Sequence, residues 1–346
     1  MTPTPALPGA GAQEVGDPPV AGGAARWAPL LRVARYGFSF VVIAALAIAC
    51  VKAAGDISSL SLRVHVGWLV LAWPLALLAF PLLAVAWSQL LMGYGHRLGV
   101  AAVVRLWCLA QASRYLPTGL AAVASRAVLA ARHGVPHAQS VMTMAVEGAL
   151  LVAWSSVASA ALVLAGGSSA IILFGVAGLL GIGGIPVILL VIGGRGDSAS
   201  APSSRLLASL LRLRRQLAHP RLRPILVADL VIGASLVVKA IVFLLFAKAL
   251  LPVGWPDVAL LVGAGNLAVI AGMIGITPAG IGVREGVMAA LLSHRFGTAN
   301  ATGLALASRG WDFVVELPWI LGSVITSHWA VRRASGMLRA RGGDDL

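Results

Sequence analysis

Six long apolar stretches alternate with short polar segments along the chain. Each provides about the 20 mostly apolar residues that one crossing of the hydrocarbon core requires. The stretches are residues 36–54, 67–92, 138–165, 168–193, 224–251 and 299–327. The pattern predicts an all-α polytopic membrane protein with about six spanning helices.

Two further apolar stretches, residues 101–133 and 257–296, are interrupted near their middle. The interruptions read Pro117-Thr118-Gly119 and Pro278-Ala279-Gly280. Proline and glycine break the helical hydrogen-bond ladder, which is tolerated at membrane depth only inside protein or beside a watery cavity. Both stretches are therefore predicted to be broken, re-entrant hairpins, and the sequence leaves open whether each dips halfway into the membrane or crosses it twice.

The two broken stretches also resemble each other. After the turn each has an arginine, an apolar arm and a basic residue before a glycine, and a long helix follows with Glu147-Gly148 or Arg309-Gly310 at a similar offset. Three spanning helices separate the hairpins, so one would open to the cytoplasm and the other to the outside. We interpret the halves as an inverted-topology repeat. Chance similarity between two Ala/Leu-rich segments is the alternative.

Charge and composition agree with a membrane location. Hydrophobic residues make up 59% of the chain and charged residues 11%. The net charge of +14 comes largely from arginines clustered in the loop 194–223 and after residue 328. This distribution follows the positive-inside rule and argues against nucleic acid as a partner. Both termini and the basic loop are predicted to be cytoplasmic.

Three regions follow from these patterns. Residues 1–25 are rich in Pro, Gly and Ala and are predicted to be a disordered tail. Residues 26–335 form the predicted transmembrane domain, and residues 336–346 a cytoplasmic C-terminal tail. Five tryptophans near the predicted helix ends are interpreted as interfacial anchors. They are Trp68, Trp73, Trp87, Trp255 and Trp329.

Charged residues inside the predicted spanning helices are the main candidates for function. They are Glu147, Lys239, Arg309, Asp312 and Glu316. Each would cost roughly 2.5–3.5 kcal/mol if it faced lipid, so each is predicted to face protein or water. The last three share one helix face and can form a ladder, and Lys239 is a candidate partner for Glu147 or Glu316. The set is either a polar path through the membrane or a group of structural ion pairs.

The broken hairpins suggest where an anion could bind. A helix that begins in the membrane after Pro117 or Pro278 directs unpaired N–H groups at its surroundings, an arrangement that suits an anion. Arg126 and Arg284 follow within the first turns and can bind a phosphate through two N–H groups. The prediction is a route for a phosphorylated lipid head group.

Simpler explanations exist for these arginines. Arg114 and Arg126 could extend to the membrane surface, and Arg284 could pair with its neighbour Glu285. The sequence contains no nucleotide-binding P-loop, no HExxH or GxSxG motif and no Asp-rich metal motif. It therefore predicts no catalytic residue, no metal and no cofactor.

Two segments carry a family resemblance. RYLPTGLAAVASRAVLAARHGV (114–135) and TPAGIGVREGVMAALL (277–292) resemble the motifs of the flippase-like membrane family, also called the lysylphosphatidylglycerol synthase transmembrane region. The resemblance covers most of residues 30–335. Together with Arg126, the motif positions that it implies as head-group ligands are Arg114, Pro117, Gly119, Pro278, Gly280, Gly282, Arg284 and Glu285.

The resemblance implies a module of the plasma membrane that moves an aminoacylated or otherwise head-group-modified lipid from the inner to the outer leaflet. Its implied partners are membrane lipids, anionic or modified, and a lipid-modifying transferase. Full-length synthases add a soluble aminoacyltransferase domain, which this chain is expected to lack. Two alternatives stay open: an accessory subunit or embedded enzyme that handles a lipid for a separate glycosyl- or aminoacyltransferase, and an ion-coupled transporter of a small solute.

Overall fold

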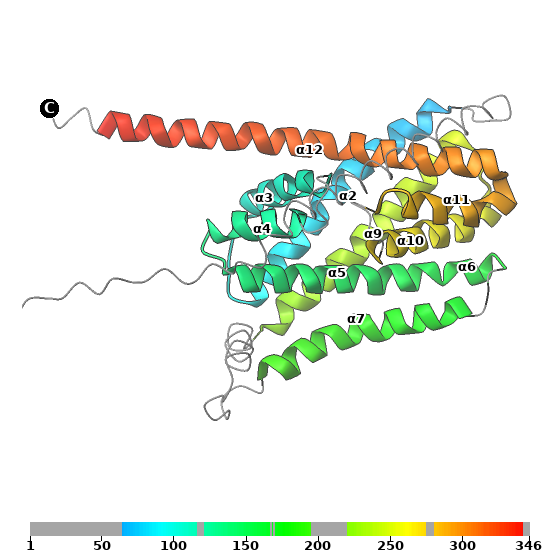
Figure 1. Cartoon of the computed structure of the whole chain (residues 1–346), viewed down its shortest axis with the longest axis horizontal. Helices are drawn as coiled ribbons and strands as arrows, with labels where there is room; N and C mark the ends of the chain where they lie inside the picture. Colours follow the sequence, from blue (N-terminus) through cyan, green and yellow to red (C-terminus); the bar gives the residue numbers. More distant parts are fainter. Residues whose placement is uncertain are drawn as a thin grey trace, which may run out of the picture.

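The computed structural model describes residues 64–115, 121–166, 168, 170–194, 220–274 and 280–341. Every regular element in this part of the chain is a helix (Figure 1). The predicted tail 1–25, the predicted helix 36–54 and most of the loop 194–223 lie outside the described residues.

Five segments of the described chain are helical, long and apolar enough to cross a membrane. They are α2 (Val66–Gly93), α5 with α6 (His137–Ser159 and Ala161–Leu164), α7 (Ala170–Gly194), α9 (Leu222–Leu250), and α10 (Val258–Ile274) with the short η3 (Trp255–Asp257). The first four coincide with predicted spanning stretches. The chain is thus an all-α polytopic membrane protein, as predicted.

The fifth segment and the last helix differ from the sequence pattern. The stretch 257–296 was expected to be a broken hairpin that either dips or crosses, and its first arm, with residues 255 and 256, forms 20 helical residues, enough for a crossing. The helix α10 carries no charged residue that would limit its depth. Conversely, α12 (Thr298–Arg341) is 44 residues long but is not among the five. Its first half contains Arg309, Asp312 and Glu316, which lower its hydropathy.

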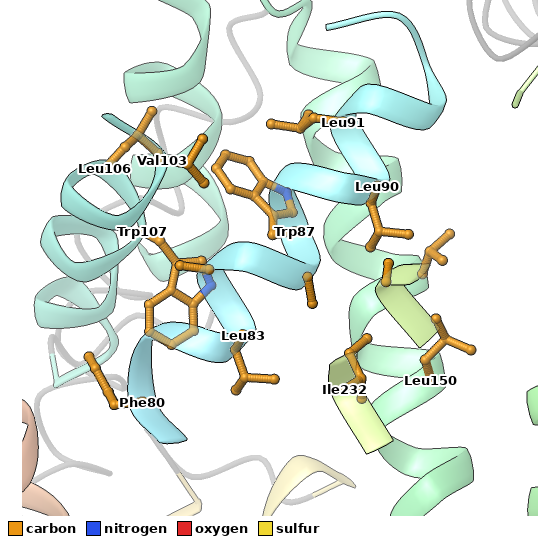
Figure 2. Close-up of a cluster of buried hydrophobic side chains, with 14 of the residues drawn as sticks. Phe80, Leu83, Trp87, Leu90, Leu91, Val103, Leu106, Trp107, Leu150 and Ile232 are labelled. Atoms are coloured by element: carbon orange, nitrogen blue, oxygen red, sulfur yellow. The ribbon is translucent and has the colours of Figure 1, made fainter. Parts of the chain in front are cut away.

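Helices α2 and α9 run antiparallel along the centre of the bundle. At one end the Arg221 N–H donates to the Gly93 carbonyl (2.8 Å), and at the other the His65 N–H donates to the Ala249 carbonyl (2.8 Å). Between these ends an apolar cluster joins α2 to α9, α3 (Val100–Ala112) and α5, with Trp87 fully buried in it (Figure 2). The antiparallel pair of α2 and α9 therefore defines two ends of the bundle, one beside Gly93 and the other beside Ala249.

Two helical hairpins enter the bundle from these opposite ends (Figure 1). Helix α3 packs on α4 (Ala121–Ala131), and the pair starts beside Gly93, whereas α10 packs on α11 (Val283–Phe296) and starts beside Ala249. Their turns, residues 116–120 and 275–279, lie outside the described residues. An inverted repeat would require this placement; the repeat and the depth of the hairpins stay predictions.

Candidate functional site

A cavity of about 570 Å³ is bounded by residues from both hairpins and by α2, α5, α9 and α12; we call it the central cavity. Its wall includes apolar side chains such as Phe80, Phe246 and Met288. All the predicted polar-path residues line it, as do four of the predicted head-group residues. The polar-path residues are Glu147, Lys239, Arg309, Asp312 and Glu316. The four head-group residues are Arg114, Arg126, Gly280 and Arg284.

The other predicted head-group residues are placed differently. Gly282 and Glu285 are not part of the cavity lining. Pro117, Gly119 and Pro278 belong to the turns outside the described residues. The structure thus brings together charged residues that lie more than 200 positions apart in sequence, as the pair of Arg114 with Glu316 shows.

Arg126 of the first hairpin lines the central cavity but is almost fully enclosed by protein. Its Nη1 donates to Glu147 Oε2 of α5 at 2.5 Å, and the Trp107 Nε1–H donates to Glu147 Oε1 at 3.4 Å. The guanidinium lies 5.2 and 5.5 Å from the ring centroids of Trp87 and Trp107. Only 8% of its side chain is exposed. Arg126 therefore does not extend to the membrane surface, and its contacts are those of a buried structural ion pair.

Arg114 connects the first hairpin to the last helix. It lies in the short helix η2 (Ser113–Tyr115), directly before the turn, and pairs with Glu316 of α12. Its side chain is 27% exposed and faces the central cavity. The Arg114 charge is therefore paired inside the bundle, and its depth relative to the membrane surface stays a prediction.

The second hairpin is joined to α12 by two crossed ion pairs. Arg284 Nη1 lies 2.7 Å from Asp312 Oδ2, and Arg309 Nε lies 3.7 Å from Glu285 Oε1. Neighbouring residues on a helix point in different directions, so Arg284 and Glu285 reach separate partners and not each other. The alternative of a local Arg284–Glu285 pair is therefore wrong. Arg309, Asp312 and Glu316 of α12 thus form ion pairs with residues of the two hairpins. The sequence had suggested that these three residues interact with one another along the helix.

The conformation of the second hairpin explains the spacing of its motif. Gly280 has φ +68°, and a Cβ there would lie 2.8 Å from the backbone of Gly272 on α10, so the two arms meet at this point. Gly282, at φ +86°, is the N-cap of α11, and its N–H donates to Glu285 Oε2 at 2.7 Å. The two glycines and Glu285 therefore shape the turn, and Arg284 is the motif residue whose charge enters the cavity.

Lys239 lies on α9 in the cavity wall, without the partner that was predicted for it. Glu147 pairs with Arg126, and Glu316 pairs with Arg114. Within the described part of the chain, Lys239 takes part in no ion pair. The charges that act on it through space belong to Arg114, Arg284, Asp312 and Glu316.

Two tryptophans of the site, Trp87 and Trp107, have a role that the sequence did not predict. Trp87 was interpreted as an interfacial anchor because it lies near the end of an apolar stretch. In the structure it is fully buried, because α3 and α5 pack against α2 and the Arg126 guanidinium of α4 lies over its ring. Trp107 was not singled out, and nothing in its local sequence marks it as a neighbour of Glu147. Trp255, in contrast, is 91% exposed, as an anchor would be.

Membrane-length helices around a cavity that holds buried ion pairs define a polytopic membrane protein with a polar interior. The chain belongs to the family of the lysylphosphatidylglycerol synthase TM region, whose model matches residues 32–319. Both motif segments lie inside this range, which confirms the resemblance noted in the sequence. The family relates the chain to lipid modification or lipid flipping. No curated protein matches it.

Proposed function

We propose that this protein is a transporter, and not an enzyme, that moves a phosphorylated or head-group-modified lipid between the leaflets of the plasma membrane. The observation that carries the proposal is the central cavity, which is lined by charged residues of two hairpins that enter from opposite ends. A site that both hairpins reach can be exposed to one side of the membrane and then to the other.

The size and chemistry of the cavity suit a head group. Its volume of about 570 Å³ is within the roughly 300–1,000 Å³ typical of small-molecule sites. Its lining holds five cationic side chains and three carboxylates, so it favours an anionic group such as a phosphate. The apolar part of the wall, which includes Phe80, Phe246 and Met288, can contact the ends of the acyl chains next to the head group, while the rest of these chains would stay in the bilayer.

The distribution of surface charge supports a cytoplasmic C-terminus. Exposed arginines gather at the end of the bundle where α2 ends and α9 begins: Arg97, Arg132, Arg221 and Arg223. The positive-inside rule assigns this end to the cytoplasm. The N-terminus of α12 lies at the opposite end, so α12 would run toward the cytoplasm.

Replacement of Arg284 with alanine is expected to lower lipid movement by about tenfold or more, because a hydrogen bond to a charged group contributes roughly 1.5–3 kcal/mol. Its partner Asp312 is partly exposed to the cavity and can be hydrated, so folding should be preserved. The measurement is the rate at which fluorescent phosphatidylglycerol changes leaflet in vesicles that contain the purified protein.

Arg132→Ala is the matched control, since it removes the same side chain from the exposed end of the first hairpin. The control should transport like the wild type. Mass spectrometry of the same vesicles should find the lipid chemically unchanged; conversion to a new product would instead identify an embedded enzyme. Equal transport by the wild type and Arg284→Ala would sink the proposed role of this arginine.

A further inference from the structure

The positive charges of the central cavity exceed the carboxylates available to them by one. Four arginines each form an ion pair with a carboxylate: Arg114 with Glu316, Arg126 with Glu147, Arg284 with Asp312, and Arg309 with Glu285. Glu285 is the one carboxylate of the four that does not line the cavity. The fifth cation is Lys239, which has no ion pair within the described chain. The excess positive charge of the cavity is therefore located at Lys239.

A cation at membrane depth is unfavourable unless it is paired or hydrated. Lys239 is half-buried in the wall beside Leu236 and Val242, near the middle of a helix of 29 residues. Arg114 and Arg284 line the same cavity, and their charges act on Lys239 through space; their side chains are 27% and 22% exposed, against 8% for Arg126. An anion beside Lys239 could thus also reach these two arginines, whereas Arg126 is enclosed by Trp87, Trp107 and Glu147.

We infer that Lys239 is the principal anion ligand of the central cavity and that it binds the phosphate group of the transported lipid. An ammonium group offers three N–H donors and a concentrated charge, both of which suit a phosphate. Arg114 and Arg284 flank the same anion, and Arg126 acts as a positioning residue for Glu147 and the indole rings. This inference rests on the proposed function, because it identifies the group that recognises the cargo.

Binding to the full-length purified protein tests the inference. The measurement is the rise of the thermal unfolding midpoint in detergent on addition of phosphatidylglycerol, of diacylglycerol or of inorganic phosphate. Phosphatidylglycerol should raise the midpoint of the wild type, whereas diacylglycerol, which has no phosphate, should not. Lys239→Met should weaken the apparent affinity for phosphatidylglycerol by about ten- to a hundredfold, and Lys239→Arg should keep most of it.

Two comparisons make the result specific. Lys248→Met removes a lysine from the same helix but outside the cavity. The Nζ of Lys248 lies 4.4 Å from the ring centroid of Trp68. The Lys248→Met variant should bind phosphatidylglycerol like the wild type. Without lipid, Lys239→Met should unfold at a midpoint equal to or above that of the wild type, since it removes an unpaired charge. That result shows that the fold is intact when lipid binding is lost.

The outcomes separate this inference from the proposed function. Unchanged phosphatidylglycerol binding by Lys239→Met overturns the inference, even if vesicles show that the wild type moves lipid. A response to inorganic phosphate without one to phosphatidylglycerol overturns the assignment of a lipid as the source of the phosphate. Lipid binding that depends on Lys239, in a wild type that moves no lipid, supports the anion site and removes the proposed transport.

Discussion

Replacement of Gly280 with alanine is expected to lower the free energy of unfolding by about 2 to 5 kcal/mol, the sum of two effects. Its φ of +68° is in the left-handed region, where a side chain costs roughly 1–2 kcal/mol. The added Cβ would also lie 2.8 Å from the Cα and carbonyl oxygen of Gly272. These are backbone atoms that no rotamer change can move, and such overpacking costs about 1–3 kcal/mol.

Denaturant or thermal unfolding of the purified protein in detergent measures this effect, with Gly286→Ala as the control. An added Cβ at Gly286 meets no atom within 4 Å, and alanine is favoured over glycine inside a helix. The control should therefore be neutral or slightly stabilising. Gly282→Ala should fall between the two, because its φ is positive but the space around it is open. Equal stabilities of Gly280→Ala and Gly286→Ala would contradict a close contact between the hairpin arms.

The positions of the spanning helices follow from the sequence because the thickness of the hydrocarbon core dictates the length of an apolar helix. The predicted stretches 67–92 and 224–251 correspond to α2 (Val66–Gly93) and α9 (Leu222–Leu250). The length of the arm before the second turn was less predictable. Its apolar run leads directly into the Pro278 break, so the sequence marks the interruption and not how far the helix extends before it.

The candidate site was predictable in its residue types but not in its pairs. Membrane depth alone identified Glu147, Lys239 and Glu316 as residues that must face protein or water. Which arginine each carboxylate meets depends on the rotation and packing of whole helices. Arg126 shows the limit most clearly. Its place after a broken turn suggested a lipid ligand, whereas two tryptophans from other helices enclose it.

Replacement of Glu147 with alanine is the other change expected to be severe, with a loss of about 3–5 kcal/mol in the free energy of unfolding. The side chains of Glu147 and Arg126 are only 6% and 8% exposed. Removal of the carboxylate would leave a buried guanidinium without its counter-charge and the Trp107 Nε1–H without its acceptor. Unfolding in detergent and the yield of folded protein from membranes both measure the loss.

The double replacement Arg126→Met with Glu147→Met should recover most of that stability, because it removes both buried charges and keeps similar side-chain volumes. A double-mutant cycle with the single variants Arg126→Met and Glu147→Met then isolates the interaction between the two residues. Strictly additive losses would contradict a direct ion pair. The recovered double variant also tests whether this pair takes part in transport: preserved phosphatidylglycerol movement in vesicles indicates a purely structural ion pair, and a folded protein that no longer moves this lipid shows that the pair is needed for lipid movement.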